Sequence, residues 1–423
     1  MFDLREEQER VILVGVQENG GAKAEESLDE LAELASTAGA KVEGRLVQVR
    51  EAIHPGTYIG KGKLEELKIL VRACDATGTI CDDELSSIQL KGLEEALECK
   101  IMDRTLLILD IFAARAVSSE GKIQVELAQL KYRASRLSGL GTSLSRLGGG
   151  IGTRGPGEKK LETDRRLIRT RITQLKRELE EVRQHRELLR EGRKRSKIPV
   201  AALVGYTSAG KSSLLNALTG SEILADAMLF STLDTTTRLL TVSDTLDVVI
   251  SDTVGFIRKL PHQLVEAFKA TLEELEYADL LLHVIDISDP HWLEQAQIVD
   301  ELIEELGAQQ IPCLRVYNKS DLYFGDIRPH GEDSVNISAK TGEGVDELLA
   351  RIDKLLDKGT RRVTIHLPYD KGGLLDMLYR EAKVGSVEYG ETIDIVATCV
   401  PRVIGQVKDY IEGYREPKED WEE

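Results

Sequence analysis

The chain of 423 residues is poor in aromatic side chains, proline and cysteine, and it contains no long apolar run. Its five cysteines form no Cys-x-x-Cys pair, which argues against a disulfide framework and against a structural zinc site. Apolar stretches such as LLILDIF (106–112) are interrupted by charge and are too short to span a bilayer. The first residues, MFDLREEQER, are unlike a secretory or transit peptide. These absences predict a cytoplasmic protein without a membrane span.

Positive charge is scarce overall and concentrated in one segment. The net charge is −17, yet residues 131–197 hold 20 Lys or Arg against 8 Asp or Glu. This segment therefore has a balance of +12, and the rest of the chain carries −29. The net charge argues against a general nucleic-acid coat, whereas this one segment is able to approach phosphate backbones.

The middle of the basic segment is rich in glycine. Residues 138–160 read SGLGTSLSRLGGGIGTRGPGEKK and contain eight glycines. Glycine loses the most backbone entropy on folding, so this strip is expected to be a slack connector or a segment that becomes ordered on a partner. Its cations are the candidate RNA contacts: Arg146, Arg154, Lys159 and Lys160.

Apolar periodicity predicts an α/β chain of several domains. Expected strands at 11–16, 41–50, 77–82 and 106–110 alternate with helices, which indicates a parallel α/β domain. Two apolar seams then flank the glycine-rich strip, and they predict two helices folded back as an antiparallel hairpin with the strip at its tip. Further strands alternating with helices predict a doubly wound sheet, and a strand–helix–strand pattern follows it.

These patterns predict five units along the chain. They are an N-terminal parallel α/β domain (1–118), a helical hairpin (119–196) with a basic Gly-rich tip (138–160), a doubly wound α/β domain (197–360), a small C-terminal α+β unit (361–413) and an acidic tail (414–423).

GYTSAGKS (205–212) follows the apolar strand VAALV and precedes a helical pattern, as a phosphate-binding loop does. Its backbone N–H groups and the start of the helix favour phosphate, and its glycines allow a close approach. Lys211 is expected to reach the β- and γ-phosphates, and the Ser212 hydroxyl to ligate Mg²⁺.

Two motifs at the ends of later strands complete a nucleotide site. In DTVG, Asp252 is expected to hold Mg²⁺ indirectly and the Gly255 N–H to contact the γ-phosphate. In NKSD, the Asp321 carboxylate can accept hydrogen bonds from the ring N–H and the exocyclic amine of guanine, two donors that adenine lacks there. Asn318 is expected to tie this loop to the phosphate loop, and Lys319 to lie along the base.

SAK (338–340) follows a further strand, and its backbone is expected to face the guanine oxygen. The order of phosphate loop, DxxG, NKxD and SAK predicts a Mg²⁺-dependent GTPase that converts GTP to GDP and phosphate. Phe256 stands where Ras-type enzymes carry the glutamine that orients the attacking water, so slow intrinsic hydrolysis is expected. Phe256 is also compatible with simple packing.

FSTLDTTTR (230–238) lies between the phosphate loop and DTVG, where switch GTPases place a threonine that reaches Mg²⁺ and the γ-phosphate. Thr232 is favoured, because related GTPases place this ligand in an F-[ST]-T setting, and Thr236 is the alternative. The expected catalytic groups are thus Lys211, Thr232 and Gly255, with Ser212 and Thr232 as the metal ligands.

The remaining candidate residues share one expected role, contact with GTP. They are Gly205, Tyr206, Thr207, Ser208, Ala209, Gly210, Lys211, Ser212, Phe230, Ser231, Thr232, Leu233, Asp234, Asp252, Thr253, Val254, Gly255, Asn318, Lys319, Ser320, Asp321, Ser338, Ala339 and Lys340.

Six stretches between residues 55 and 268 resemble the HflX-type GTPases, a translation-associated group related to the Obg GTPases. Thr235 departs from the proline expected in the threonine segment, and the C-terminal unit matches more weakly. The stretches are PGTYIGKGKLEEL, IFAARAVSSEGKIQVELAQLKYRASRL, GGGIGTRGPGEKKLETDRR, GYTSAGKSSLLNAL, FSTLDTTTR and DTVGFIRKLPHQLVEAF.

The resemblance implies binding of the large ribosomal subunit through its rRNA, stimulation of GTP hydrolysis there, and a role in splitting or rescuing ribosomes under stress. A monomer that associates with ribosomes in the cytoplasm is expected. Two alternatives stay open: a signalling GTPase that binds only proteins, and an RNA remodeller that uses the Gly-Lys-Gly loop at 60–62.

Overall fold

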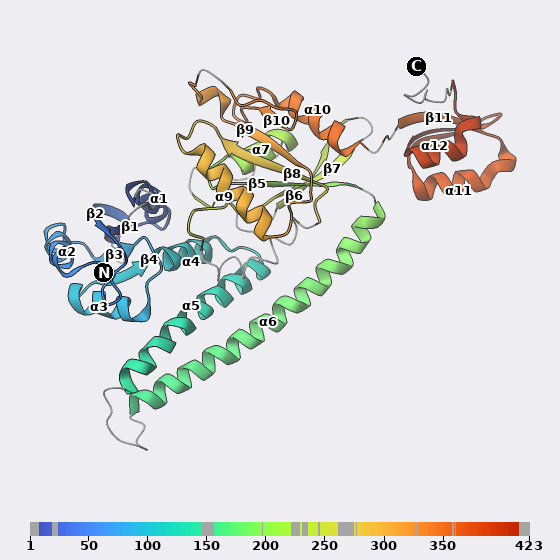
Figure 1. Cartoon of the computed structure of the whole chain (residues 1–423). Helices are drawn as coiled ribbons and strands as arrows, with labels where there is room; N and C mark the ends of the chain where they lie inside the picture. Colours follow the sequence, from blue (N-terminus) through green and yellow to red (C-terminus); the bar gives the residue numbers. More distant parts are fainter. Residues whose placement is uncertain are drawn as a thin grey trace, which may run out of the picture.

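A computed structural model shows three β-sheets and a pair of long helices (Figure 1). For the helical residues 138–145, 156–161 and 185–196 it describes the backbone alone. The structure describes residues 8–18, 24–145, 156–196, 198–220, 229–230, 236–243, 246–260, 275, 277–325, 328–357, 359 and 361–413.

The N-terminal sheet has four parallel strands in the order β2-β1-β3-β4. Alternate residues of β1 point to opposite faces: Val11 and Leu13 pack with α1 and α4, whereas Ile12 and Val14 pack with α2 and α3. Helices therefore cover both faces of this sheet. Its elements are β1 (Arg10–Glu18), α1 (Ala24–Thr37), β2 (Lys41–Arg50), α2 (Lys61–Ala73), β3 (Gly78–Cys81), α3 (Ser87–Leu97), β4 (Lys100–Asp103) and α4 (Arg104–Arg115).

The prediction of a strand at 106–110 is wrong, because these residues lie in α4. The Asp103 side chain caps this helix by accepting a hydrogen bond of 2.9 Å from the Leu106 N–H. The run is apolar because the helix is buried between the N-terminal sheet and the next domain, and a short buried run has the same pattern in a helix and a strand. The fourth strand is the preceding β4.

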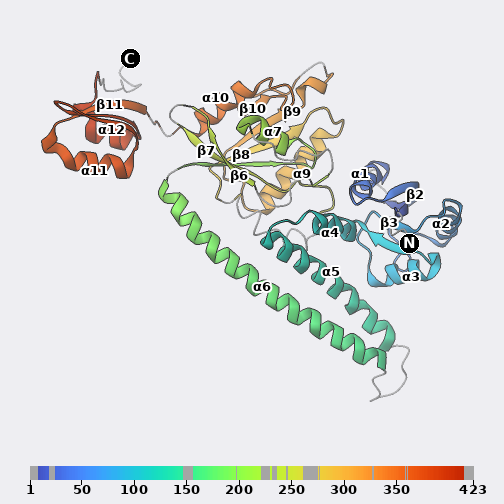
Figure 2. The ribbon, with the colours of Figure 1, turned by 180° about the vertical axis from the view of Figure 1, so that it is seen from behind.

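α5 (Ser119–Ser145) and α6 (Pro156–Ser196) lie side by side and run in opposite directions (Figures 1 and 2). Arg171 Nε donates to Glu126 Oε1 at 2.7 Å, and Arg165 Nη2 donates to the Leu137 carbonyl at 2.5 Å. Leu175 of α6 is fully buried. No helix in the described part of the chain, these two included, is long and apolar enough to cross a membrane.

The helices extend into the strip that the sequence assigns to a loop. Residues 138–145 belong to α5, and 156–160, with Lys159 and Lys160, belong to α6. Glycine weakens a helix by only about 1 kcal/mol relative to alanine, and Pro156 suits a first helical position. The candidate contacts Arg146 and Arg154 lie outside the described residues.

The central sheet has six strands in the order β10-β9-β8-β5-β7-β6, and it is mixed because β6 runs antiparallel to β7. β6 begins at the end of the threonine segment and was not predicted. The phosphate loop, DTVG and NKSD all leave the carboxyl ends of parallel strands, so the topology brings them to one edge. The elements are β5 (Val200–Gly205), α7 (Lys211–Thr219), β6 (Thr236–Thr241), β7 (Asp247–Asp252), β8 (Leu280–Asp286), α9 (Trp292–Glu305), β9 (Cys313–Asn318), η1 (Ser320–Leu322), β10 (Ser334–Asn336) and α10 (Val345–Leu356).

The C-terminal unit has an antiparallel sheet in the order β11-β13-β12. The sequence predicts a strand, a helix and one further strand here, whereas the structure has two strands after the helix, because residues 383–399 form a hairpin. A turn divides it, in which the Gly390 N–H donates to the Thr392 carbonyl at 2.9 Å. The elements are β11 (Arg361–Leu367), η2 (Tyr369–Lys371), α11 (Gly372–Glu381), β12 (Lys383–Tyr389), β13 (Ile393–Cys399), α12 (Pro401–Val407) and η3 (Lys408–Tyr410).

Candidate nucleotide-binding site

The phosphate loop joins β5 to α7 and folds around the side chain of Lys211. The buried Lys211 Nζ donates to the carbonyls of Gly205 and Tyr206 at 3.0 and 2.8 Å. Burial lowers the pKa of Lys211 to about 8, although the nearby Asp252 carboxylate acts in the opposite direction. Phosphate at this position favours the charged form of Lys211, so anion binding and protonation of this amine are coupled.

Ser212, in helix α7, and Asp252, the last residue of β7, meet beside the phosphate loop. The Ser212 hydroxyl donates to Asp252 Oδ2 at 2.8 Å, and both residues are buried. A hydroxyl and a carboxylate are hard oxygen donors of the kind that Mg²⁺ prefers. The chemistry of this pair therefore fits a magnesium site.

The DTVG segment lies directly on the phosphate loop. The Thr207 N–H donates to the Phe256 carbonyl at 2.7 Å, and the Phe256 N–H donates to the Gly205 carbonyl at 3.1 Å. A Cβ atom on Gly255 would lie 2.9 Å from Thr207 Cγ2, so this position requires glycine. The Phe256 side chain is 1% exposed and belongs to the hydrophobic core that the N-terminal and central domains share.

Asn318 joins the three loops around the expected base pocket. Its Nδ2 donates to the Ala209 carbonyl at 2.9 Å, and its Oδ1 accepts from the Ala339 N–H at 3.0 Å. Gly210, with φ +93°, has no room for a Cβ atom, which would lie 2.3 Å from Asn318 Nδ2. One N–H of the SAK backbone, which is expected to face the guanine oxygen, is thus engaged by Asn318. This contact holds SAK to NKSD directly.

The two charged residues of NKSD have different surroundings. Lys319, expected along the base, donates to Asp286 Oδ2 at 2.6 Å. Asp321 lies in η1 and is half-buried. Asp286 was not predicted as part of the site, although its place at the end of β8 is the kind of position that contributes to such an edge.

Most of the threonine segment, including Thr232, Ser231, Leu233 and Asp234, lies outside the described residues. The alternative ligand Thr236 is the first residue of β6 and pairs with Asp252 in the sheet register. The buried Phe230 ring packs against Phe112 of α4, with centroids 4.6 Å apart. The Phe230 side chain therefore contacts the N-terminal domain.

Tyr206 of the phosphate loop is a contact between domains that was not predicted. Its hydroxyl accepts a hydrogen bond from the Arg258 N–H at 2.8 Å and donates to the Glu30 carboxylate of α1. Burial, and then the charge of Glu30, raise the pKa of the Tyr206 phenol well above its ordinary value. The phenol thus remains a neutral donor that links the phosphate loop to the N-terminal domain.

Arg104 is the centre of a buried ionic network at the same interface. It contacts Asp82 at 2.7 Å and Glu30 at 2.8 Å, and it donates to the Arg258 carbonyl at 3.3 Å. Lys259 Nζ contacts Asp82 at 2.5 Å from the other side. Burial raises the pKa of Asp82, but Arg104 and Lys259 outweigh it and lower that pKa. The N-terminal domain thereby holds the residues that follow DTVG.

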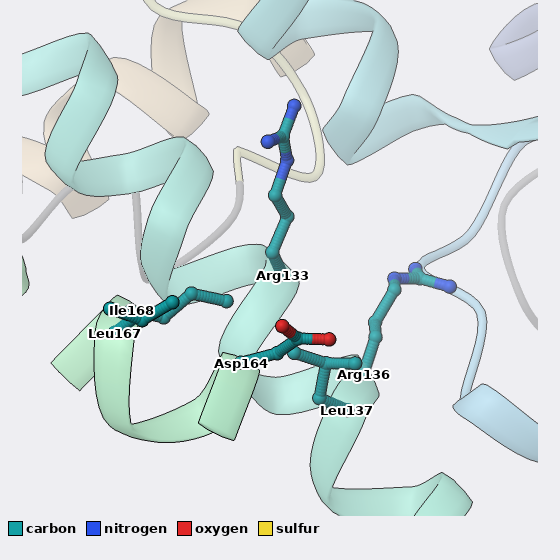
Figure 3. A pocket seen from close by; sticks show the side chains of 6 residues that line it. All are labelled: Arg133, Arg136, Leu137, Asp164, Leu167 and Ile168. Atoms are coloured by element: carbon teal, nitrogen blue, oxygen red, sulfur yellow. The ribbon is translucent and has the colours of Figure 1, made fainter. Parts of the chain in front are cut away.

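The helical pair contains a recess of about 480 Å³, shown in Figure 3. Three aliphatic side chains, one aspartate and two arginines line it. Arg136 forms an ion pair with Asp103 of the N-terminal domain, whereas Arg133 is exposed. The recess is lined by Arg133, Arg136 and Leu137 of α5 and by Asp164, Leu167 and Ile168 of α6.

Models of four protein families match successive parts of the chain. They are described as GTP-binding GTPase N-terminal (25–113), GTP-binding GTPase Middle Region (115–193), 50S ribosome-binding GTPase (200–319) and HflX C-terminal domain (328–396). A GTPase HflX of Lacrimispora saccharolytica is 51% identical over 420 residues, which cover 98% of this chain and 99% of that protein. The chain belongs to the HflX family of GTPases.

Other HflX proteins are similar over most of their length. The GTPase HflX of Escherichia coli K12 is 44% identical over 387 residues, 90% of each chain. Among solved structures, a GTP-binding protein from the archaeon Sulfolobus solfataricus in complex with GDP is 26% identical, with a TM-score of 0.44, and the match covers 82% of this chain and 98% of that one.

Proposed function

We propose that this HflX-family chain hydrolyses GTP to GDP and phosphate with Mg²⁺, and that it binds the large ribosomal subunit through the basic tip at 138–160. The observation that carries the first part is the arrangement of Lys211, Ser212 and Asp252 beneath a phosphate loop that Asn318 ties to the base-binding loops. In the family such a cycle would serve ribosome splitting or rescue under stress.

Ser212 and Thr232 would ligate Mg²⁺, and Asp252, hydrogen-bonded to Ser212, would hold that hydroxyl in place. The ion would neutralise charge on the β- and γ-phosphates. Lys211 would bind the same phosphates from the loop side, while the Gly255 N–H would donate to the γ-phosphate. Asp321 would select guanine by accepting two hydrogen bonds from its edge.

Replacement of Asp321 by asparagine tests the base pocket. Asp321→Asn turns a double acceptor into a mixed donor and acceptor, so GTP affinity should fall and xanthosine triphosphate should be preferred. Competition binding with a fluorescent GDP analogue measures both. Unchanged GTP affinity would show that the base lies elsewhere.

Ribosome binding is supported by the charge distribution and by the family description of the central domain as a 50S ribosome-binding GTPase. The long packed helices α5 and α6 end and begin within the basic strip, and the chain outside residues 131–197 carries −29. Phosphate contacts from such a strip release counterions, so the affinity should fall steeply with salt.

The test compares GTP turnover of the full chain alone, with purified large subunits and with small subunits. Large subunits should raise the rate, and sedimentation should show a complex. If large subunits change neither rate nor sedimentation, the ribosomal part of the proposal is lost and a GTPase that binds only proteins becomes the better description.

The tip is tested by replacing its four cations, Arg146, Arg154, Lys159 and Lys160, with alanine. Affinity for large subunits should fall, and the slope of its logarithm against log salt should shrink by about 0.7 to 0.9 for each phosphate that is no longer neutralised. GTP affinity of the free protein should stay unchanged. A control variant removes the same charge at four exposed sites, Lys354, Lys371, Arg380 and Arg402.

A further inference from the structure

We propose that the Thr207 hydroxyl orients the water that attacks GTP, the task for which Phe256 has no suitable group. This inference rests on the proposed GTP hydrolysis and adds a positioning residue to it. It depends on the burial of Thr207, on its neighbours and on the direction of the Phe256 side chain.

Thr207 carries a buried hydroxyl that makes no hydrogen bond within the described residues. The residue is 6% exposed, and its Oγ1 atom is shielded from solvent. Burial of a hydroxyl without a hydrogen bond is unfavourable, and such a group in a native site calls for a partner. A bound reactant supplies one, because Thr207 is part of the phosphate loop.

The neighbours of Thr207 are the groups assigned to the γ-phosphate. A Cβ atom on Gly255 would lie 2.9 Å from Thr207 Cγ2, 3.0 Å from Thr207 Cα and 3.2 Å from Lys211 Nζ. Thr207, Gly255 and Lys211 therefore converge on one small region. Lys211 and the Gly255 N–H both donate to phosphate oxygens, and the attacking water still needs a partner of its own.

Two backbone hydrogen bonds fix Phe256 so that its side chain points away from this region. Its carbonyl accepts from the Thr207 N–H at 2.7 Å, and its N–H donates to the Gly205 carbonyl at 3.1 Å. Its ring is buried in the core shared with the N-terminal domain. The residue after DTVG is thus fixed as a packing residue, and the same two hydrogen bonds place Thr207 beside Gly255.

A hydroxyl group offers one donor and two acceptor sites. Thr207 Oγ1 accepts a hydrogen bond from the water and donates to a γ-phosphate oxygen, which directs a water lone pair at the phosphorus. The water oxygen forms the new bond to phosphorus as the bond to the bridging oxygen breaks. The electron pair of that bond leaves with GDP, and the proton of the water passes to a phosphate oxygen. Thr207 is unchanged at the end.

The test compares variants that keep or remove the hydroxyl. Thr207→Val preserves the shape and Thr207→Ala reduces it, whereas Thr207→Ser retains the hydroxyl. Single-turnover GTP hydrolysis should fall about 100-fold in the first two variants and remain near the wild-type rate in the third. Affinity for GDP should stay unchanged in all three, because GDP lacks the γ-phosphate and the attacking water that the hydroxyl contacts.

Affinity for GDP with aluminium fluoride, which imitates the transferred phosphoryl group, gives a readout independent of turnover. It should weaken in the valine and alanine variants relative to GDP alone, and not in the serine variant. Thr241→Val, on the exposed strand β6, is the matched control and should behave as wild type.

Two results overturn the inference: wild-type turnover in either variant that lacks the hydroxyl, or equal losses in the serine and valine variants, which would indicate a role for the methyl group. Failure of the wild-type chain itself to hydrolyse GTP would instead remove the proposed function, and the inference with it.

Discussion

The central domain is joined to its two neighbours in different ways. On the N-terminal side the two domains share one hydrophobic core, and Arg104 is buried between carboxylates of the N-terminal domain and the Arg258 carbonyl. On the C-terminal side the unit has a core of its own and stands apart in Figure 1, and an exposed Lys383 pairs with Asp247.

The contrast indicates which neighbour responds to nucleotide. Tyr206, Arg258 and Lys259 belong to the phosphate loop and to the segment after DTVG, and all three contact the N-terminal domain. If GTP binds as proposed, a change at the γ-phosphate acts on these contacts directly. The described C-terminal contact is made on β7 at Asp247, at the opposite end of that strand from DTVG.

Removal of the Arg104 side-chain charge should have the largest effect. Arg104→Met leaves the buried Asp82 and the half-buried Glu30 without the guanidinium that both contact, so the free energy of unfolding should fall by about 3 to 5 kcal/mol. Lys383→Met, which breaks the exposed pair, should change it by less than about 1 kcal/mol. Urea denaturation measures both, and similar losses would contradict the comparison.

A cavity in the C-terminal core should affect that unit alone. Ile395 is fully buried in β13, and Ile395→Ala should destabilise the unit by about 2 to 5 kcal/mol. Hydrogen exchange should accelerate within 361–413, while GDP affinity stays at the wild-type value. A change in GDP affinity would show that the two domains are coupled after all.

The contact between Tyr206 of the phosphate loop and Glu30 of α1 should contribute less to the free energy of unfolding. In a double-mutant cycle with Tyr206→Phe and Glu30→Gln, the coupling free energy should be about 1 to 2 kcal/mol, typical of a hydrogen bond to a charged group. Thermal or urea unfolding of the four proteins gives this value. Strict additivity of the two single changes would mean that the hydrogen bond contributes nothing.

The smallest expected effect is a pH-dependent contribution of one hydrogen bond in the C-terminal sheet to stability. His366 Nδ1 is 2.7 Å from Asp394 Oδ1, and this hydrogen bond raises the pKa of His366 above its ordinary value. The stabilisation is complete below the unfolded pKa, about 6.5, and is lost as pH rises through the folded pKa. An NMR titration of the His366 ring should show the raised pKa, and Asp394→Asn should lower it toward its ordinary value, although Glu412, 3.7 Å from His366 Nε2, remains.

The sequence predicts the order of strands and loops in the central domain well, because each motif follows an apolar strand. It fails where local pattern carries no information about burial. Residues 106–110 have the composition of a buried strand, and they form a helix because the shared core covers α4. β6 is a polar edge strand whose pairing with β7 depends on tertiary structure.

The residues in and around the candidate nucleotide site also fall into two groups, those that the sequence predicts and those that it does not. Lys211, Asp252 and Asn318 are recognisable because backbone geometry and phosphate chemistry fix their spacing within motifs. Glu30 and Arg104 lie far away in the chain, and no local spacing connects them to Tyr206. Their contribution depends on how two domains dock, which periodicity and motif spacing do not encode.

The length of α6 has a mechanical consequence. Its 41 residues span about 60 Å, and only a few residues separate its end at Ser196 from β5, which starts at Val200 and leads into the phosphate loop. Over such a length, a tilt of about 5° moves the far end by roughly 5 Å. A small reorientation where α6 meets the sheet is therefore magnified at the far end of the helix, and a push on that far end turns the strand that leads into the phosphate loop.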